Sequence, residues 1–137
     1  MTVRATSAAE WGVGTALPPL QIPPISRTTL ALFAGASGDH NPIHIDLDVA
    51  RSAGRDDVFA HGMLSMAYLG RYLTDMVPQD RIRSFSARFT AITPVYAEPT
   101  CRAMVRETDG DTAVLDLEVT LADGTRTLLG EAVIDIT

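Results

Sequence analysis

The residues best suited to acid–base chemistry lie in the stretch 37–44, which reads SGDHNPIH. Asp39 supplies a carboxylate, and His44 supplies an imidazole five positions later. Pro42 has a fixed φ and pushes Asn41 towards an extended conformation, so the bend between the two groups is stiff. Such a bend could direct both groups at one water molecule and make them an acid–base pair. An Asx-turn with a surface histidine has the same spacing and remains an alternative.

A second candidate is the sequence AHGM at 60–63, immediately before a long apolar segment. The first turn of a helix has unpaired backbone N–H groups and the positive end of the helix dipole. A glycine there, Gly62, would let a ligand oxygen approach closely, so its amide could stabilise a developing oxyanion. Alternatively, Gly62 is only a helix cap and His61 is a satisfied core residue.

Other reactive residue types fit catalysis less well. An aspartate and a histidine five positions apart do not match a common zinc spacing, and the chain has three histidines, so no metal site is expected. Ser65 lacks the G-x-S-x-G context of a nucleophile and is interpreted as a packing residue or a minor polar contact. Cys101 lies at an alternating strand position and is expected in the core. Arg81, Arg83 and Arg88 could form an anion patch, although solvated strand charges are the favoured interpretation.

Three helices are predicted before the strands begin. Ser26 can cap a helix with apolar residues at 30, 33 and 34, and this helix must end at the glycines of 35–38, just before the bend. The stretch 46–55 resembles a short second helix. The longest helix is predicted over 62–77, and because its first half is apolar nearly all round, we expect it to be buried.

From residue 81 onward the apolar residues alternate with a period of two, which predicts strands. Asp-Gly pairs at 109–110 and 123–124 mark hairpin turns within an antiparallel meander. The proline-rich stretch 13–26 is predicted to be an extended arm or an edge strand. The fold class is therefore α+β, with an antiparallel sheet wrapped around the helix at 62–77.

Length and composition indicate one domain over 1–137, with 1–9 expected to be flexible. The net charge of -6 and the absence of a Lys/Arg cluster argue against nucleic-acid binding. No apolar run is long enough to span a membrane, and the first residues do not resemble a signal peptide. Together with a single cysteine, these features favour the cytoplasm.

The ordered motifs VGTALPPL, FAGASGDHNPIHID and VFAHGM resemble those of the MaoC-like acyl dehydratases, the R-specific 2-enoyl-CoA hydratases. The resemblance covers 13–136 and is carried most specifically by Asp39-x-Asn41-Pro42-x-His44. A related strand-joining stretch, PVYAEPT, has Glu98-Pro99 where the family usually has glycine and aspartate. The resemblance implies a hot-dog fold, in which an antiparallel sheet wraps around one long helix.

The resemblance also implies roles for individual residues. Asp39 and His44 would activate water for addition to a trans-2-enoyl thioester, giving the (R)-3-hydroxyacyl product, with the division of proton transfer between them left open. The Gly62 amide would bind the thioester oxygen. Substrate contacts are expected from a second set of residues: Asn41, His61, Met63 and Ser65. No metal or redox cofactor is implied, and coenzyme A or an acyl carrier protein would only carry the substrate.

Assembly and two alternative functions complete the expectations. Such domains usually pair through their sheets, so a homodimer or higher homo-oligomer is expected, or a heteromer with a related chain. The acyl chain would lie near the interface, beside residues such as Met63, Leu64, Met66 and Tyr68. One alternative is a hot-dog thioesterase, but the expected helix has its acid, Asp75, at the far end. The other alternative is a non-catalytic acyl-binding subunit of a heteromeric dehydratase.

Overall fold

The computed structural model describes residues 10–137, so the predicted flexibility of 1–9 lies outside the described residues. Five strands form one antiparallel sheet in the order β1-β3-β4-β5-β2. The bounds of the strands are β1 Leu20–Gln21, β2 Ile82–Phe89, β3 Thr100–Thr108, β4 Thr112–Thr120 and β5 Arg126–Asp135. The proline-rich arm thus ends in β1 at one edge of the sheet, as predicted.

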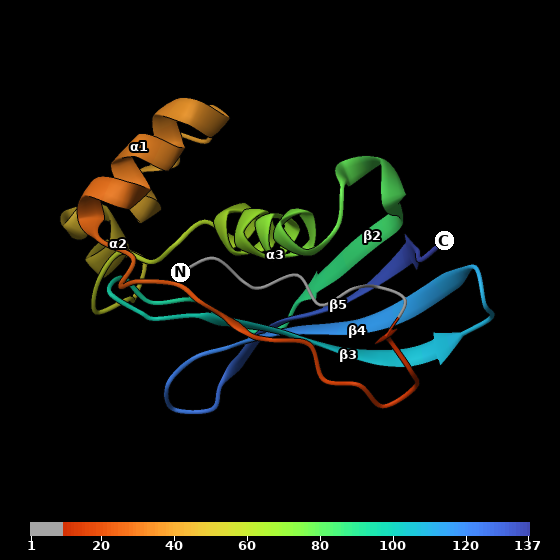
Figure 1. Ribbon diagram of the computed structural model, residues 1–137. Helices are drawn as coiled ribbons and strands as arrows, with labels where there is room; N and C mark the ends of the chain where they lie inside the picture. Colours follow the sequence, from red (N-terminus) through yellow and green to blue (C-terminus); the bar gives the residue numbers. More distant parts are fainter. Residues whose placement is uncertain (1–9) are drawn as a thin grey trace.

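One long helix, α3 Gly62–Met76, packs on the inner face of this sheet (Figure 1). The strand residues that alternate towards α3 are buried, which confirms the predicted period of two; they include Cys101, Ala103, Val105, Ala113, Leu115, Leu117 and Val119. From α3, Leu69, Tyr72 and Leu73 are fully buried against them. This arrangement confirms the expected hot-dog fold and the α+β class.

The connections between strands follow the predicted hairpins, with one exception. Gly110 and Gly124 have φ of 97° and 88°, the left-handed conformation that an Asp-Gly turn requires. They link β3 to β4 and β4 to β5. However, β2 pairs with β5 and not with β3, the next strand in sequence. The connection 90–99 leads from β2, at one edge of the sheet, to β3, near the opposite edge. The meander of sequential neighbours is therefore limited to β3, β4 and β5.

The expectation that α3 is buried is confirmed for the side of the helix that faces the sheet, but not for its other side. On the side of the helix that faces away from the sheet, Met63 is 57% exposed and Arg71 is also exposed. A single sheet can cover only one side of a helix, and the short helices lie near the start of α3 (Figure 1). Because the first half of α3 is apolar on most sides, part of its apolar surface, including Met63, is exposed.

Two short helices flank the bend at 39–44. The first is α1 Arg27–Ser37, which is capped by Ser26 through Thr29 N–H, as predicted. The bend ends in the 3-10 turn η2 Pro42–His44, and α2 Leu47–Ser52 follows, capped by Asp46. A second apolar cluster joins these elements to the start of α3; it contains Ile25, Leu30, Ala50, Val58, Ala60 and Leu64. This cluster fixes the bend beside the first turn of α3.

One further 3-10 turn, η3 Gln79–Arg81, connects α3 to β2. Across residues 10–137, no helix has the length and apolar character needed to cross a membrane.

Candidate active site

The bend begins where α1 ends, and its first part is an Asx-turn. Gly38 caps α1 with φ of 77°, a left-handed conformation that glycine adopts readily. The Oδ1 atom of Asp39 then accepts the N–H of Asn41 at 3.2 Å, and Oδ1 of Asn41 accepts the N–H of Ile43 at 3.1 Å. Asn41 has φ of -56° and ψ of 118°, which keeps it out of the helical region, as expected before a proline. The turn engages Oδ1 of Asp39 and leaves Oδ2 for another contact.

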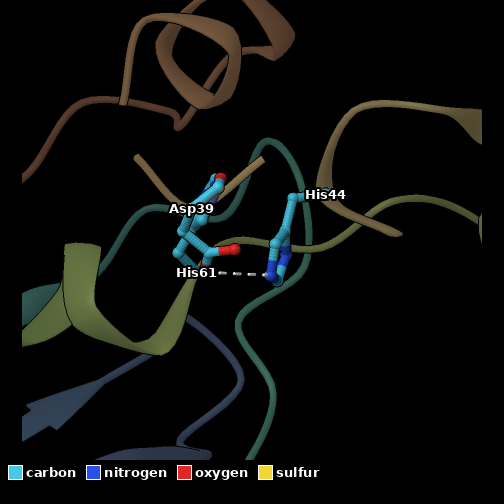
Figure 2. A group of neighbouring side chains, drawn as sticks. All are labelled: Asp39, His44 and His61. Atoms are coloured by element: carbon cyan, nitrogen blue, oxygen red, sulfur yellow. Dashed lines mark hydrogen bonds and ion pairs between the residues drawn. The ribbon is translucent and has the colours of Figure 1, made fainter. Parts of the chain in front are cut away.

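His44 faces that second oxygen. Its Nδ1 lies 2.7 Å from the backbone carbonyl of Phe59, and because a carbonyl can only accept, Nδ1 carries the proton. In the neutral ring Nε2 therefore has a lone pair, and this atom lies 4.0 Å from Oδ2 of Asp39 (Figure 2). The His44 side chain is 10% exposed and that of Asp39 is 51% exposed. The acid and the base thus meet at the surface of the fold.

His61 lies behind this pair. Its ring stacks on that of His44, with centroids 4.0 Å apart and planes inclined by 27°. Its Nε2 lies 3.2 Å from the backbone carbonyl of Asp39, so Nε2–H donates to that oxygen. Burial lowers the pKa of His61, because an apolar environment disfavours the charged imidazolium. At neutral pH the ring is therefore neutral.

The first turn of α3 reaches the same place. His61 occupies the N-cap position but makes no side-chain cap hydrogen bond. The amide N–H groups of Gly62 and Met63 have no hydrogen-bond acceptor among residues 10–137. A Cβ atom on residue 62 would lie 3.1 Å from the ring of Phe89. Glycine therefore lets this ring pack close to the backbone, and no side chain of residue 62 obstructs the amide. These free donors can bind a ligand oxygen.

The four expected substrate contacts divide into two groups. Asn41 and Met63 are exposed, so a ligand can reach them. His61 is 1% exposed, and Ser65 is fully buried, where its hydroxyl lies 3.3 Å from that of Thr93. The sequence indicated a minor polar contact for Ser65, and the Thr93 hydroxyl is that contact. Neither buried side chain presents surface to a ligand in this chain.

The side chains of Asp39, His44 and His61 are near enough to be considered as metal ligands, with one ligand atom of each within 4.8 Å of the others. A shared ion would need both imidazoles to point a nitrogen lone pair, which lies in the ring plane, at one position. Stacked rings instead face each other. The donor set therefore suits proton transfer better than metal coordination, and the absence of a metal cofactor stays a prediction.

Other residues singled out in the sequence are accounted for by structure. Arg83 forms an ion pair with Asp135 on the neighbouring strand, which fits a solvated strand charge. Cys101 is buried, and burial raises the pKa of its thiol to about 12. At neutral pH such a thiol is protonated, so it does not act as a nucleophile.

Three contributors to the site were not found from the sequence. The Phe59 carbonyl sets the tautomer of His44, the Thr93 hydroxyl pairs with Ser65, and the Phe89 ring packs over Gly62. A backbone carbonyl has no residue-type signal. Phe89 fits the strand period but is 49% exposed, and only its place at the end of an edge strand, beside α3, explains its contact.

Comparison with known proteins adds an independent line of information. The sequence model of a protein family, described as "MaoC like domain", matches residues 14–125 of this chain. The 3-hydroxyacyl-thioester dehydratase X of Mycobacterium tuberculosis is 34% identical over 93 residues, which are 68% of this chain and 32% of that protein. The (R)-specific enoyl-CoA hydratase of Rhodospirillum rubrum is 39% identical over 54 residues, which are 39% of this chain and 38% of that protein. The match thus spans about a third of the length of each curated relative.

The fold also matches a solved structure, that of the unliganded R-hydratase PhaJ1 from Pseudomonas aeruginosa. The TM-score is 0.85 at 27% sequence identity, covering 94% of this chain and 84% of that chain. The match of the family model covers most of the chain and includes the bend, the start of α3 and the first four strands. On this ground, the chain belongs to the MaoC-like domain family.

Proposed function

We propose that this protein catalyses the reversible hydration of a trans-2-enoyl thioester to the (R)-3-hydroxyacyl thioester. The observation that carries the proposal is the pairing of the Asp39 carboxylate with the free Nε2 of His44 at 4.0 Å. This separation is too long for a direct hydrogen bond, but one water oxygen can contact both atoms. The family to which the chain belongs, and the two named relatives, support the same chemistry.

The reaction would use three groups. Nε2 of His44 accepts a proton from water as the water oxygen bonds to Cβ of the substrate, while Asp39 orients the water. Electron density moves to the thioester oxygen, where the Gly62 N–H stabilises the developing enolate. The proton then returns to Cα from the Asp39–His44 pair, and because both additions occur from one side, the addition is syn. The product is the (R) isomer when the substrate presents to the water the face of Cβ that yields it. The sum is addition of water without net oxidation or reduction, so a redox cofactor is not required.

The position of the acids favours hydration over thioester hydrolysis. A hydrolase of this fold would be expected to carry its carboxylate on the central helix, near the start of that helix. Asp75 lies at the opposite end of α3, about 20 Å from Gly62 at 1.5 Å per residue. It also faces Arg71 at 3.8 Å, one turn away. The helix α3 therefore supplies no carboxylate at the site, and the acid there, Asp39, belongs to the bend and faces His44.

The test is to incubate the purified protein with crotonyl-CoA and follow two signals. Loss of enoyl absorbance without release of free thiol is the expected result, and chiral analysis should give the (R) product. Thiol release would indicate hydrolysis. Absence of both signals, with binding of an acyl thioester retained, would favour the non-catalytic subunit. A series of chain lengths, each carried by coenzyme A or by an acyl carrier protein, then identifies the substrate.

We also propose that the protein acts as a homodimer or higher homo-oligomer. Two features support this. Among residues 10–137, no strand pairs with the outer edge of β2, and large apolar side chains near the site are exposed, including Met63 and Phe89. An unpaired strand edge commonly pairs with a second chain. Size measurement on active protein should give at least twice the mass of one chain. Activity that appears only with a second, related chain would favour a heteromer.

A further inference from the structure

The side chain of His61 contacts both halves of the proposed acid–base pair without reaching the surface. Its Nε2–H donates to the backbone carbonyl of Asp39 at 3.2 Å, and its ring stacks on His44 at 4.0 Å (Figure 2). With 1% exposure it presents almost no area to a ligand. A role for His61 in the reaction would therefore act through its two neighbours.

The alternative explanation, that His61 only stabilises the fold, is opposed by two features. An N-cap side chain normally accepts a hydrogen bond from the first turn of its own helix, but His61 makes no such bond with α3. Its Nδ1 atom is buried and has no hydrogen-bond partner in the described part of the chain. Burying an unpaired acceptor is unfavourable. His61 therefore lacks both a cap hydrogen bond to α3 and a partner for Nδ1. Its one side-chain hydrogen bond within the described residues is the one to the Asp39 carbonyl.

The hydrogen bond to Asp39 determines which nitrogen of the His61 ring carries the proton and which way the ring points. Donation by Nε2–H leaves Nδ1 as the unpaired acceptor, and the turned-away side chain leaves the amides of Gly62 and Met63 uncapped. The ring is also held from its other side, where Phe33 contacts it edge-on at 4.9 Å. His61 therefore fixes the Asp39 bend against α3 while the helix N–H groups stay open.

We propose that His61 is a positioning residue, whose Nε2–H holds the Asp39 backbone so that the carboxylate stays opposite Nε2 of His44. The inference rests on the proposed function for its catalytic consequence, although the contact itself can be tested without it. The hydrogen bond is the decisive contact, because His44 has a second anchor at the Phe59 carbonyl.

Two variants separate the hydrogen bond from the ring. His61→Gln keeps an N–H donor near the position of Nε2 and removes the ring, whereas His61→Phe keeps a ring and removes the donor. Because a small misplacement of reacting groups can cost up to 10²-fold, we expect kcat to fall about 10-fold or more in His61→Phe with little change in KM. In His61→Gln, kcat should stay within about threefold of the wild type, since the retained donor still fixes Asp39.

A matched control is Tyr72→Phe, which also removes a buried donor to a backbone carbonyl, that of Pro18, but lies within the main core. It should lower the melting temperature without changing kcat. If both His61 variants lose kcat equally, or if KM rises while kcat is unchanged, the positioning role is excluded.

Two NMR measurements on the full chain do not depend on activity. In the wild type, His61 should carry its proton on Nε2 and His44 on Nδ1. The amide of Asn41, which donates to Asp39 Oδ1, should exchange about fivefold faster in His61→Phe and at the wild-type rate in His61→Gln and Tyr72→Phe. An Nδ1–H tautomer of His61, or unchanged exchange in His61→Phe, would overturn the inference. Lack of hydration by the wild type, with these NMR results intact, would refute the proposed function alone.

Discussion

The imidazole of His44 is held between two oxygens of different kinds: the Phe59 carbonyl on Nδ1 at 2.7 Å and the Asp39 carboxylate facing Nε2 at 4.0 Å. The first contact fixes which nitrogen carries the proton, and the second places an acid opposite the lone pair. In the proposed reaction, these two contacts orient the ring as a base before any substrate binds.

Replacing Asp39 with asparagine should abolish most of the activity while keeping the bend. The amide oxygen of asparagine can still accept the N–H of Asn41, so the Asx-turn and the fold should survive. We expect kcat to fall by about 10²-fold or more, the usual worth of a general acid–base group. Steady-state hydration kinetics with circular dichroism of the variant check this, and near-full activity would contradict the assigned role.

Replacing His44 with asparagine separates the base from its anchor. The Nδ2 of asparagine can take the place of Nδ1 and donate to the Phe59 carbonyl, but no group then replaces Nε2. We expect a loss in kcat of about 10²-fold or more while circular dichroism still shows a folded protein. If the variant retains more than a tenth of wild-type activity, another residue must accept the proton.

Gly62→Ala should impair catalysis more than stability. The added methyl would lie 3.1 Å from the ring of Phe89, which is half-exposed and can move, so the fold should tolerate it. The methyl and the displaced ring would obstruct the amide, and removing an oxyanion donor costs about 10²-fold in kcat.

The matched control for this change is Gly70→Ala in the same helix. There the methyl would make an ordinary contact with Phe85 at 3.6 Å. Because alanine favours helix over glycine, this variant should be up to about 1 kcal/mol more stable, with unchanged kcat. Equal kcat for both variants would argue against a role for the Gly62 amide.

Asn41 is expected to brace the bend through its side chain. Asn41→Ala removes the oxygen that accepts the N–H of Ile43 and should cost about 1 kcal/mol of unfolding free energy, as for other cap residues. Asn41→Ser retains a cap acceptor and should recover most of this loss. Chemical denaturation measures both, and equal stability of the two variants would show that the side-chain hydrogen bond contributes nothing.

The buried thiol of Cys101 should lower the free energy of unfolding at alkaline pH. Burial raises the pKa of its thiol from 9.0 to about 12, so the unfolded chain releases this proton at a lower pH than the native protein. Between these values the native state binds more protons, and stability should fall by at most about 1.4 kcal/mol per pH unit. In Cys101→Ala this decline should be weaker, as measured by denaturation from pH 8 to pH 11. Parallel curves for the two proteins would show that the thiol does not titrate this way.

The sequence predicted the features that depend on local pattern. Ser26 as a cap, the Asp-Gly hairpins and the alternating strands each follow from neighbouring residues, and all are confirmed. The pairing of β2 with β5 could not be predicted, because it depends on the path of the connection 90–99.

The burial of α3 was predicted correctly for only one side of the helix, for a related reason. Apolar composition shows that a helix surface needs to be covered, but it does not identify what covers it.

At the candidate site, spacing and stiffness were sufficient to bring Asp39 and His44 together. What could not be predicted was the contribution of groups from distant positions. The Phe59 carbonyl has no side-chain signal, and the stacking of His61 on His44 depends on how α3 is placed against the bend. Contacts between a side chain and a distant main-chain group depend on the tertiary structure, which residue spacing alone does not determine.

Every group assigned to the chemistry comes from one continuous stretch, 39–62, outside the sheet, while the sheet contributes apolar walls such as Phe89. If the proposed function holds, reactivity and substrate choice therefore depend on different segments of the sequence. On the proposed function, substitutions near Phe89 in β2 would change the space beside Gly62 while the reacting groups stay unchanged. Substrate preference could then change one substitution at a time without loss of the Asp39–His44 pair.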